Sequence, residues 1–346
     1  MKEWFEKQTE RRFDVQKLGQ AEWYLQSRIT QLADYSIILD QSRYAALVAG
    51  RYLSPVNEDQ IPTSIKVKYA SPLPSGTVFT KQDCSQSYAD VMKIQEEFGF
   101  EYAAAVGSLI YLMNTFVKLA FAIRKLAKFM QKPGRKHFET LKHLLHHIQC
   151  HRCSAGIKFY SDMKLSPLYQ MMIETGNAVH ADAPLILFTD SSFQDCPDTT
   201  KSTGGYLIFM RGVVDNSSHL AGVVCHSSCE AEYCHATSGL MAAAFIRKVF
   251  NEILGFNSDK PLTIPLGIDS QSAMDTANSH KETSRTRHIA RRYHYVRFAQ
   301  MNSETTLFKV DGTRNPSNSM TKVLTADQLD EEAAISSRSR SLKCLS

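Results

Sequence analysis

The sequence predicts an α/β protein in which a mixed five-stranded sheet is flanked by helices and follows a smaller, mostly helical region. Apolar runs separated by glycine and polar turns indicate three antiparallel strands, at residues 185–189, 206–210 and 220–226. The apolar spacing then becomes helical, and strands alternate with helices. Three successive strands followed by this alternation are typical of one mixed sheet with helices on both faces.

The later elements have clear expected positions. They are a long helix at 228–254 that Gly255 closes, a strand at 262–269, a helix from Gln271, a basic helix at 285–301, a strand at 306–310 and a last helix near Ser317.

The first half of the chain is expected to be mostly helical. A short strand at 35–39 precedes a helix at 42–52, and two helices with a break near 114–115 precede a third at 136–150. Prolines interrupt the intervening pattern. The resulting division is a fragment at 1–53, a linker or extended loop at 54–101, a helical region at 102–183, the α/β domain at 184–325 and a disordered tail at 326–346.

Composition limits the classes of protein that this chain can be. With 43% hydrophobic and 22% charged residues over 346 positions, it has enough apolar material for about two globular domains of roughly 150 residues. No stretch approaches the roughly 20 apolar residues of a membrane span, so no membrane partner is expected. The eight cysteines follow no regular framework and the chain opens with charged residues, so reduced thiols in a cytoplasmic or nuclear protein are expected.

Positive charge is concentrated in two stretches although the net charge is only +5. Residues 118–158 are dense in Lys, Arg and His and contain one acid, Glu139, and a second basic run covers 285–297. Together they fit a polyanionic partner, whereas either run alone is more often a solvated helix face.

Three acidic positions follow the strand–helix–strand pattern of the α/β domain. Asp190 and Asp269 each end an apolar run, and Glu230 and Glu232 open the long helix. Strand ends and a helix start can converge on one sheet edge. Residues two apart on a helix point about 200° apart, so one glutamate faces the site, and we select Glu232. Carboxylate oxygens are the ligands of Mg²⁺ ions that assist phosphodiester hydrolysis.

Five blocks of sequence carry a family resemblance, at residues 187–190, 202–206, 227–233, 268–273 and 287–294. In this order they resemble the ribonuclease H domain of copia-type retrotransposon polyproteins. Residues 13–19, 39–44 and 105–112 resemble the same polyprotein after its polymerase palm. Residues 1–53 then correspond to a thumb-like fragment and 102–183 to the connection region. The Tyr-x-Asp-Asp polymerase motif is missing, so no polymerase activity is expected from this chain alone.

The resemblance implies particular residues and cofactors. Asp190, Glu232 and Asp269 take the first three metal-binding positions, and Asn318 stands where the family has a fourth, aspartate, position. Two Mg²⁺ ions, or Mn²⁺, would serve hydrolysis of the RNA strand of an RNA/DNA hybrid, with other retroelement polyprotein products as further partners. The residues expected to hold nucleic-acid phosphates are Arg285, Arg287, His288, Arg291, Arg292 and His294.

Several alternatives remain open at this point. Besides Asn318, the chain departs from the family at 116–118 and Ala290, and His235 stands where a small residue is usual. A noncatalytic nucleic-acid-binding remnant therefore competes with the nuclease, and a truncated reading frame that never folds is a third possibility. Each acid alone reads as an ordinary cap or strand-end residue.

A second motif, Cys150-x-x-Cys153 with two nearby histidines, invites a zinc site. An exposed basic helix is the preferred interpretation because no second ligand pair follows. Cys225, Cys229 and Cys234 are expected to be buried thiols that pack like apolar residues.

Overall fold

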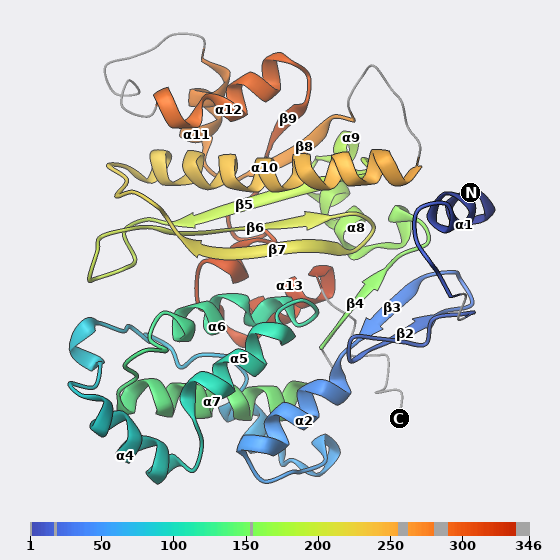
Figure 1. Cartoon of the computed structure of the whole chain (residues 1–346). Helices are drawn as coiled ribbons and strands as arrows, with labels where there is room; N and C mark the ends of the chain where they lie inside the picture. The colour runs from blue at the N-terminus through green and yellow to red at the C-terminus, as the bar shows by residue number, and fades with distance from the viewer. Residues whose placement is uncertain (1, 17–18, 153–154, 255–261, 280–289, 337–346) are drawn as a thin grey trace.

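The computed structural model describes residues 1–346 except 1, 17–18, 153–154, 255–261, 280–289 and 337–346 (Figure 1). Its main sheet has the strand order β7-β6-β5-β8-β9. The strands are β5 (Ile186–Ser192), β6 (Thr203–Phe209), β7 (Val213–Leu220), β8 (Ile264–Ile268) and β9 (Thr305–Lys309). β5, β6 and β7 pair antiparallel, whereas β8 runs parallel to both β5 and β9. The predicted mixed five-stranded sheet is thus confirmed.

The third strand was predicted in the wrong place. The prediction of 220–226 followed an apolar run, but β7 begins at Val213 and ends at Leu220. The strand reads Val-Val-Asp-Asn-Ser-Ser-His-Leu, which is mostly polar because β7 is the edge of the sheet. Its backbone pairing with β6, rather than an apolar pattern, holds it in place.

One face of this sheet is covered by α10 (Ser228–Leu254), α11 (Gln271–Asn278) and α12 (Ala290–Met301) (Figure 1). Alternate strand residues such as Leu187 and Ile208 point to these helices. The bounds of α10 agree with the prediction, whereas Gly255 and the expected start of the basic helix at 285–289 lie outside the described residues.

The opposite face packs against the helices of the first half. These are α5 (Tyr102–Leu112), the 3₁₀ turn η3 (Val117–Leu119), α6 (Ala120–Ala127) and α7 (Arg135–His151). Phe188, Leu207 and Phe209 of the sheet belong to one hydrophobic core with Phe116 and Leu145 of this helical region. The helical region is therefore a second layer on the sheet, with the predicted break between α5 and α6.

Burial corrects the interpretation of α7 as an exposed basic helix. His147, Cys150 and His151 near its end are all buried, and Cys153 lies outside the described residues. The helix is clamped between α2 and the short helices of residues 58–68, so most of its faces are covered. Cys225 and Cys234 are buried as expected, whereas Cys229 is partly exposed.

A second sheet connects the start of the chain to the helical region. It has four antiparallel strands in the order β1 (Trp23–Tyr24), β2 (Ser27–Gln31), β3 (Ile37–Asp40) and β4 (Gly156–Phe159). After β3 comes α2 (Ser42–Tyr52), which packs on α7. Because β4 follows α7 in sequence but pairs with β3, this sheet ties residues 23–40 to residues 156–159.

Residues 54–101 are not the predicted linker or extended loop. They form η1 (Glu58–Gln60), α3 (Thr63–Lys68), η2 (Lys81–Asp83) and α4 (Tyr88–Phe98). A reciprocal capping box of Ser87 and Asp90 starts α4, and Gly99 in the left-handed region, at a φ of 77°, ends it. The prolines therefore separate short helices rather than prevent structure.

The predicted disordered tail is likewise wrong in part. Residues 326–336 form α13 (Ala326–Ser336), whose Leu329, Glu332 and Ser336 are buried, while 337–346 lie outside the described residues. The remaining elements are α1 (Lys2–Glu10), η5 (Met163–Leu165), α8 (Pro167–Glu174), α9 (Ala178–Ala181) and η6 (Asn318–Met320). Of the helices described, none is long and apolar enough for a membrane crossing.

A candidate metal site at the end of strand β5

Three carboxylates meet where β5 and β8 end. Asp190 lies in β5, Asp269 follows β8, and Glu232 lies in the first turns of α10. One oxygen from each lies within 4.8 Å of the others. Because β5 and β8 are parallel neighbours, their carboxyl ends lie side by side, and α10 crosses the same edge. The structure thus brings together the three acids selected from the sequence.

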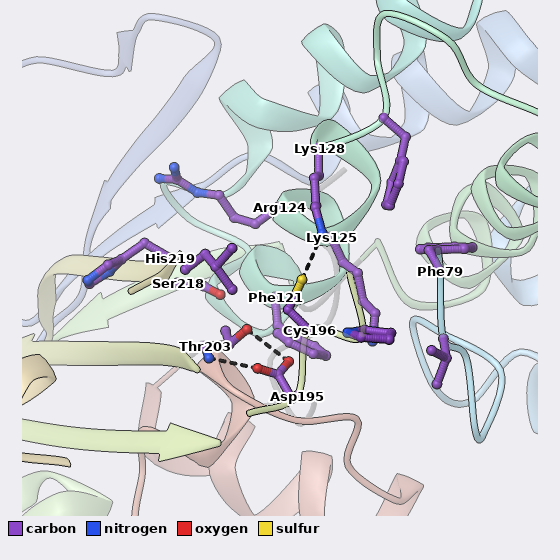
Figure 2. A pocket seen from close by; sticks show the side chains of 14 residues that line it. Phe79, Phe121, Arg124, Lys125, Lys128, Asp195, Cys196, Thr203, Ser218 and His219 are labelled. Atoms are coloured by element: carbon purple, nitrogen blue, oxygen red, sulfur yellow. Dashed lines mark hydrogen bonds between the residues drawn. The ribbon is translucent and has the colours of Figure 1, made fainter. Parts of the chain in front are cut away.

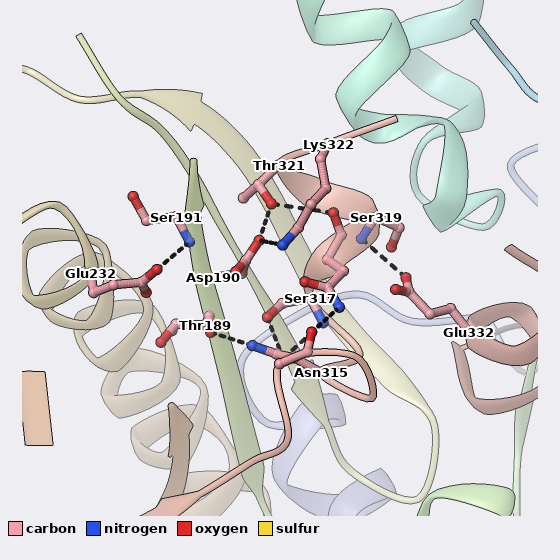
Figure 3. Close-up of polar contacts among 12 residues, drawn as sticks. Thr189, Asp190, Ser191, Glu232, Asn315, Ser317, Ser319, Thr321, Lys322 and Glu332 are labelled. Atoms are coloured by element: carbon pink, nitrogen blue, oxygen red, sulfur yellow. Dashed lines mark hydrogen bonds and ion pairs between the residues drawn. The ribbon is translucent and has the colours of Figure 1, made fainter. Parts of the chain in front are cut away.

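The two glutamates of α10 have different surroundings. Glu230 turns back to the helix start, where its Oε2 accepts a hydrogen bond from the His226 N–H at 2.7 Å. Glu232 instead accepts a hydrogen bond from the Ser191 N–H at 3.1 Å through Oε1 (Figure 3). Its Oε2 is buried without a hydrogen-bond partner in the described structure. An orphaned carboxylate oxygen in such a place is a position for a ligand.

Asp190 is held by the segment that follows η6. Its Oδ2 accepts a hydrogen bond from the Thr321 hydroxyl and lies 3.4 Å from the Lys322 ammonium (Figure 3). Lys309 donates to the backbone carbonyl of Asp269 on the other side of the cluster. Two lysines therefore border three acids that are only partly neutralised.

The electrostatics of the cluster follow from this crowding. Burial, together with the charges of Asp190 and Asp269, raises the pKa of Glu232 to about 9. Burial and the Asp190 charge also raise the pKa of Asp269, although Lys322 and Lys309 oppose this. A cluster of three acids in which the pKa values of Glu232 and Asp269 are raised suits a hard divalent cation, because such an ion offsets the repulsion between the carboxylates. The donor set therefore fits Mg²⁺ or Mn²⁺.

Asn318 lies in η6, beside the cluster. Its amide Nδ2 donates to the Gly312 carbonyl at 2.9 Å, and its Oδ1 is buried without a hydrogen-bond partner among the described residues. A methyl group placed on Gly312 would lie 3.3 Å from Asp269 Oδ2, so Asn318 grips a loop that touches the cluster. The amide holds this loop and brings an oxygen without charge.

Further residues of the site were not selected from the sequence. Asn315 donates through Nδ2 to the Thr189 carbonyl at 2.8 Å and accepts from the Ser317 N–H at 3.1 Å, which fastens the last loop to β5. Glu332 of α13 accepts from the Ser319 N–H at 3.0 Å (Figure 3). Thr321 and Lys322 closely follow Asn318 in the sequence, which was an available signal for this segment. Glu332, in contrast, lies in the part of the chain that was expected to be a disordered tail.

A histidine replaces the small residue that is usual three positions after the site glutamate. The ring of His235 lies against Gly204 of β6 so closely that a Cβ there would be 1.9 Å from the ring. The His235 ring therefore fits in this position because residue 204 has no side chain. Burial and the neighbouring His219 lower the pKa of His235 to about 3, so its ring is neutral.

The predicted phosphate-binding residues are placed only in part. Arg291, Arg292 and His294 belong to α12, which packs on α10. Arg285, Arg287 and His288 lie outside the described residues.

Comparisons with known proteins agree with the blocks of resemblance. No family model matches the chain. It is 26% identical over 324 residues to the "Retrovirus-related Pol polyprotein from transposon TNT 1-94" of Nicotiana tabacum, which covers 92% of this chain and 22% of that protein. It is 28% identical over 199 residues to the Pol polyprotein from transposon RE1 of Arabidopsis thaliana, which covers 57% of this chain and 12% of that protein.

Among solved structures, ribonuclease H1 from Halobacterium salinarum NRC-1 is similar with 17% identity and a TM-score of 0.29, covering 38% of this chain and 89% of that protein. The assignment of the fold therefore depends on the strand order and register of the main sheet, and not on this superposition. By sequence, the chain is similar over 92% of its length to one plant retrotransposon Pol polyprotein and over 57% to another, which confirms the resemblance indicated by its ordered blocks. It spans less than a quarter of the length of either relative.

Proposed function

We propose that this chain is a metal-dependent nuclease of the ribonuclease H type, which hydrolyses the RNA strand of an RNA/DNA hybrid. The observation that carries the proposal is the convergence of Asp190, Glu232 and Asp269, whose oxygens lie within 4.8 Å of one another. Each comes from a different element, and two are almost fully buried. Burying two acids beside a third is costly unless a cation or another partner compensates them, so a metal site is the best account of the cluster.

The three acids would hold the metal, and their neighbours would orient them. Two Mg²⁺ ions, when bound, supply activation of the attacking water and stabilisation of the departing 3′ oxygen. The Ser191 N–H fixes the Glu232 carboxylate, and the Thr321 hydroxyl fixes Asp190. Because burial raises the pKa of Glu232 to about 9, loading of the site near neutral pH would release its proton.

The substrate would be recognised by shape and charge. A ribonuclease distinguishes RNA from DNA by contacts to the 2′-hydroxyl groups. The basic run that includes Arg291, Arg292 and His294 would hold phosphates, which position a duplex without reading its sequence. Arg285, Arg287 and His288 are included among the proposed phosphate-binding residues. Other retroelement polyprotein products are proposed as further partners.

A noncatalytic nucleic-acid-binding remnant is the second candidate, and two observations favour it. Asn318 brings no charge to the fourth position, and its amide is committed to the Gly312 carbonyl at 2.9 Å. The Lys322 ammonium, 3.4 Å from Asp190, already supplies part of the positive charge that a second cation would supply. Both features lower the attraction of the site for divalent ions.

Cleavage of a hybrid by the full chain separates the two candidates. The substrate carries a label on its RNA strand, and the metal is added to or withheld from purified protein. Cleavage that needs Mg²⁺ or Mn²⁺ and disappears in Glu232→Gln supports the nuclease. Glu230→Gln is the matched control, because it lies two residues away on the same helix and outside the cluster, and it should retain cleavage.

The opposite outcome is equally specific. If the unmutated chain binds the hybrid in a salt-sensitive manner but never cleaves it, the remnant is the correct reading. A chain that neither binds nor cleaves while melting cooperatively would remove both candidates.

A further inference from the structure

A hollow lies between α6 and the edge of the main sheet, and the proposed nuclease does not use it. It has a volume of about 190 Å³ and is lined by residues from α6, from the β5–β6 loop, from β7 and from the segment around Phe79 (Figure 2). A cavity of about 150 Å³ is known to hold a benzene ring, so this hollow has room for an aromatic group. Its lining is more apolar than polar.

The apolar part of the lining is aromatic. Phe79, Phe121 and Phe129 all border the hollow, and Phe79 and Phe129 pack edge to face with their ring centroids 5.5 Å apart. Flat hydrophobic walls of this kind bind planar rings by offset or edge contacts. A nucleobase is such a ring, and stacking on aromatic side chains tolerates any base.

The rim of the hollow is positively charged. Arg124 and Lys125 of α6 line it, and neither forms an ion pair with a carboxylate among the described residues. Lys125 lies 5.1 Å from the centre of the Phe121 ring, and its ammonium is partly withdrawn from water. A half-buried cation that makes no direct ion pair favours an anionic ligand.

Asp195, which lines the hollow, and Asp198, which lies outside the lining, are both already engaged. Asp195 accepts from the Thr203 N–H at 2.7 Å and from the Thr203 hydroxyl at 2.8 Å. Asp198 lies 3.8 Å from the Lys128 ammonium, which also donates to Cys196 Sγ at 3.0 Å. Lys125 faces the charge of Asp195, and Arg124 faces that of Asp215, which lies outside the lining of the hollow. Among the lining residues, Arg124, Lys125 and Lys128 outnumber Asp195, so the lining keeps net positive charge.

An unpartnered hydroxyl points to a ligand independently of charge. Ser218 lines the hollow, is 1% exposed and has a buried Oγ without a hydrogen-bond partner in the described structure (Figure 2). A buried polar atom normally finds a partner, and a ligand oxygen would provide one.

Strand register sets the hollow beside the candidate metal site. Asp190 pairs with Gly205, and Gly205 pairs with Ser218, so the three lie in one row across β5, β6 and β7. Two strand spacings correspond to about 10 Å. Met320 packs over Gly205 between them, at a place where a Cβ would come within 2.2 Å of the methionine. The hollow is therefore separate from the carboxylates but close to them.

We propose that this hollow binds a nucleoside monophosphate group, with its base against the phenylalanine rings and its phosphate on Arg124, Lys125 and the Ser218 hydroxyl. The group has two possible sources, a free mononucleotide or one nucleotide of a strand that also reaches the carboxylates. The second source rests on the proposed function. The affinity of the hollow for the monophosphate is independent of the proposed function.

Calorimetric titration of the full chain with adenosine 5′-monophosphate tests the proposal. The buffer contains EDTA, so the carboxylate site cannot contribute through a metal. We expect saturable binding at one site, at least about tenfold tighter than for adenosine or ribose 5-phosphate, because each lacks one of the two recognised groups. Absence of saturable binding, or equal binding of ribose 5-phosphate, would overturn the proposal.

Variants locate the binding. Arg124→Gln and Lys125→Gln should each weaken binding about tenfold, whereas Lys142→Gln, an exposed lysine on α7 outside the hollow, should not. Ser218→Ala should weaken binding and leave the melting temperature unchanged or higher, because the hydroxyl has no partner to lose. Unchanged affinity in Arg124→Gln and Lys125→Gln would contradict the assignment even if the nucleotide bound.

Cys196 supplies a second readout at the same place. Burial raises the pKa of its thiol, but hydrogen bonds from Lys128 and Thr199 outweigh this and lower it overall. Bound nucleotide should slow alkylation of Cys196 by iodoacetamide and leave Cys229, partly exposed on α10, unchanged. Equal rates at Cys196 with and without saturating nucleotide would overturn the placement.

A trinucleotide distinguishes the two sources. Binding at least about tenfold tighter than the monophosphate assigns the hollow to a strand, and equal binding assigns it to a free nucleotide. Hybrid cleavage is measured separately, so a failure of the nuclease and a failure of the hollow give different results.

Discussion

Glu332 of α13 is a buried acid whose replacement should stabilise the protein. Its side chain is 7% exposed, and burial raises its pKa to about 8 although the Ser319 N–H donates to its Oε2. A carboxyl group with a folded pKa above its unfolded value of 4.5 contributes stability below that value and loses it as the pH rises toward about 8. At pH 7 the cost of keeping it protonated is about 3 kcal/mol, at about 1.4 kcal/mol per pH unit.

The variant Glu332→Gln removes this cost and keeps an acceptor for Ser319. We expect it to unfold at a higher urea concentration than the unmutated chain at pH 7, by up to about 3 kcal/mol in the free energy of unfolding. The gain should shrink as the pH falls toward 4.5 and level off above about 8. Glu331→Gln, on the exposed side of the same helix, is the matched control and should change stability by less than about 0.5 kcal/mol.

Urea titrations in EDTA, from about pH 5 to about pH 9, measure the free energy of unfolding of both variants relative to the unmutated chain. Subtracting the unmutated chain removes the contribution of Glu232, which has the same sign. A stability difference that stays constant with pH, or one shared by Glu331→Gln, would refute the reasoning.

Four further outcomes are expected. Gly204→Ala should cost about 1 to 3 kcal/mol of stability because its methyl meets the His235 ring, and the cost should largely vanish in the His235→Ala background, as a double-mutant cycle by urea unfolding would measure. Asn318→Asp should increase metal-dependent cleavage of a hybrid, and unchanged or lower cleavage would show that the fourth position does not limit the rate. Mg²⁺ should raise the melting temperature in a manner that EDTA reverses, and the shift should be lost in Asp269→Asn. Deleting residues 326–346 should lower the melting temperature, since α13 contributes buried Leu329, whereas a disordered tail would be dispensable.

The acids of the candidate site could be predicted because their signals are local. Asp190 and Asp269 end apolar runs, and the helical period alone separates Glu232 from Glu230. The boundaries of α10 were equally clear because a long helix repeats its pattern over many turns.

Other parts depend on contacts that the sequence pattern does not display. β4 is four residues long and is held by pairing with β3, which lies far away in the chain. β7 is polar because it lies at the sheet edge. Glu332 reaches the site only through the fold of α13, so its role has no local signal. In contrast, the capping box of Ser87 and Asp90 was a readable sign of α4 within a segment taken for a linker.

The two halves of the chain share one hydrophobic core, which makes the stability of each depend on the other. Phe188, Leu207 and Phe209 share a core with the helical region that precedes them in the chain. A fragment that begins at residue 184 would therefore expose these apolar side chains and tend to aggregate. Mutations that disrupt the upstream helices would therefore also destabilise the α/β domain. The two halves should therefore unfold in one cooperative transition.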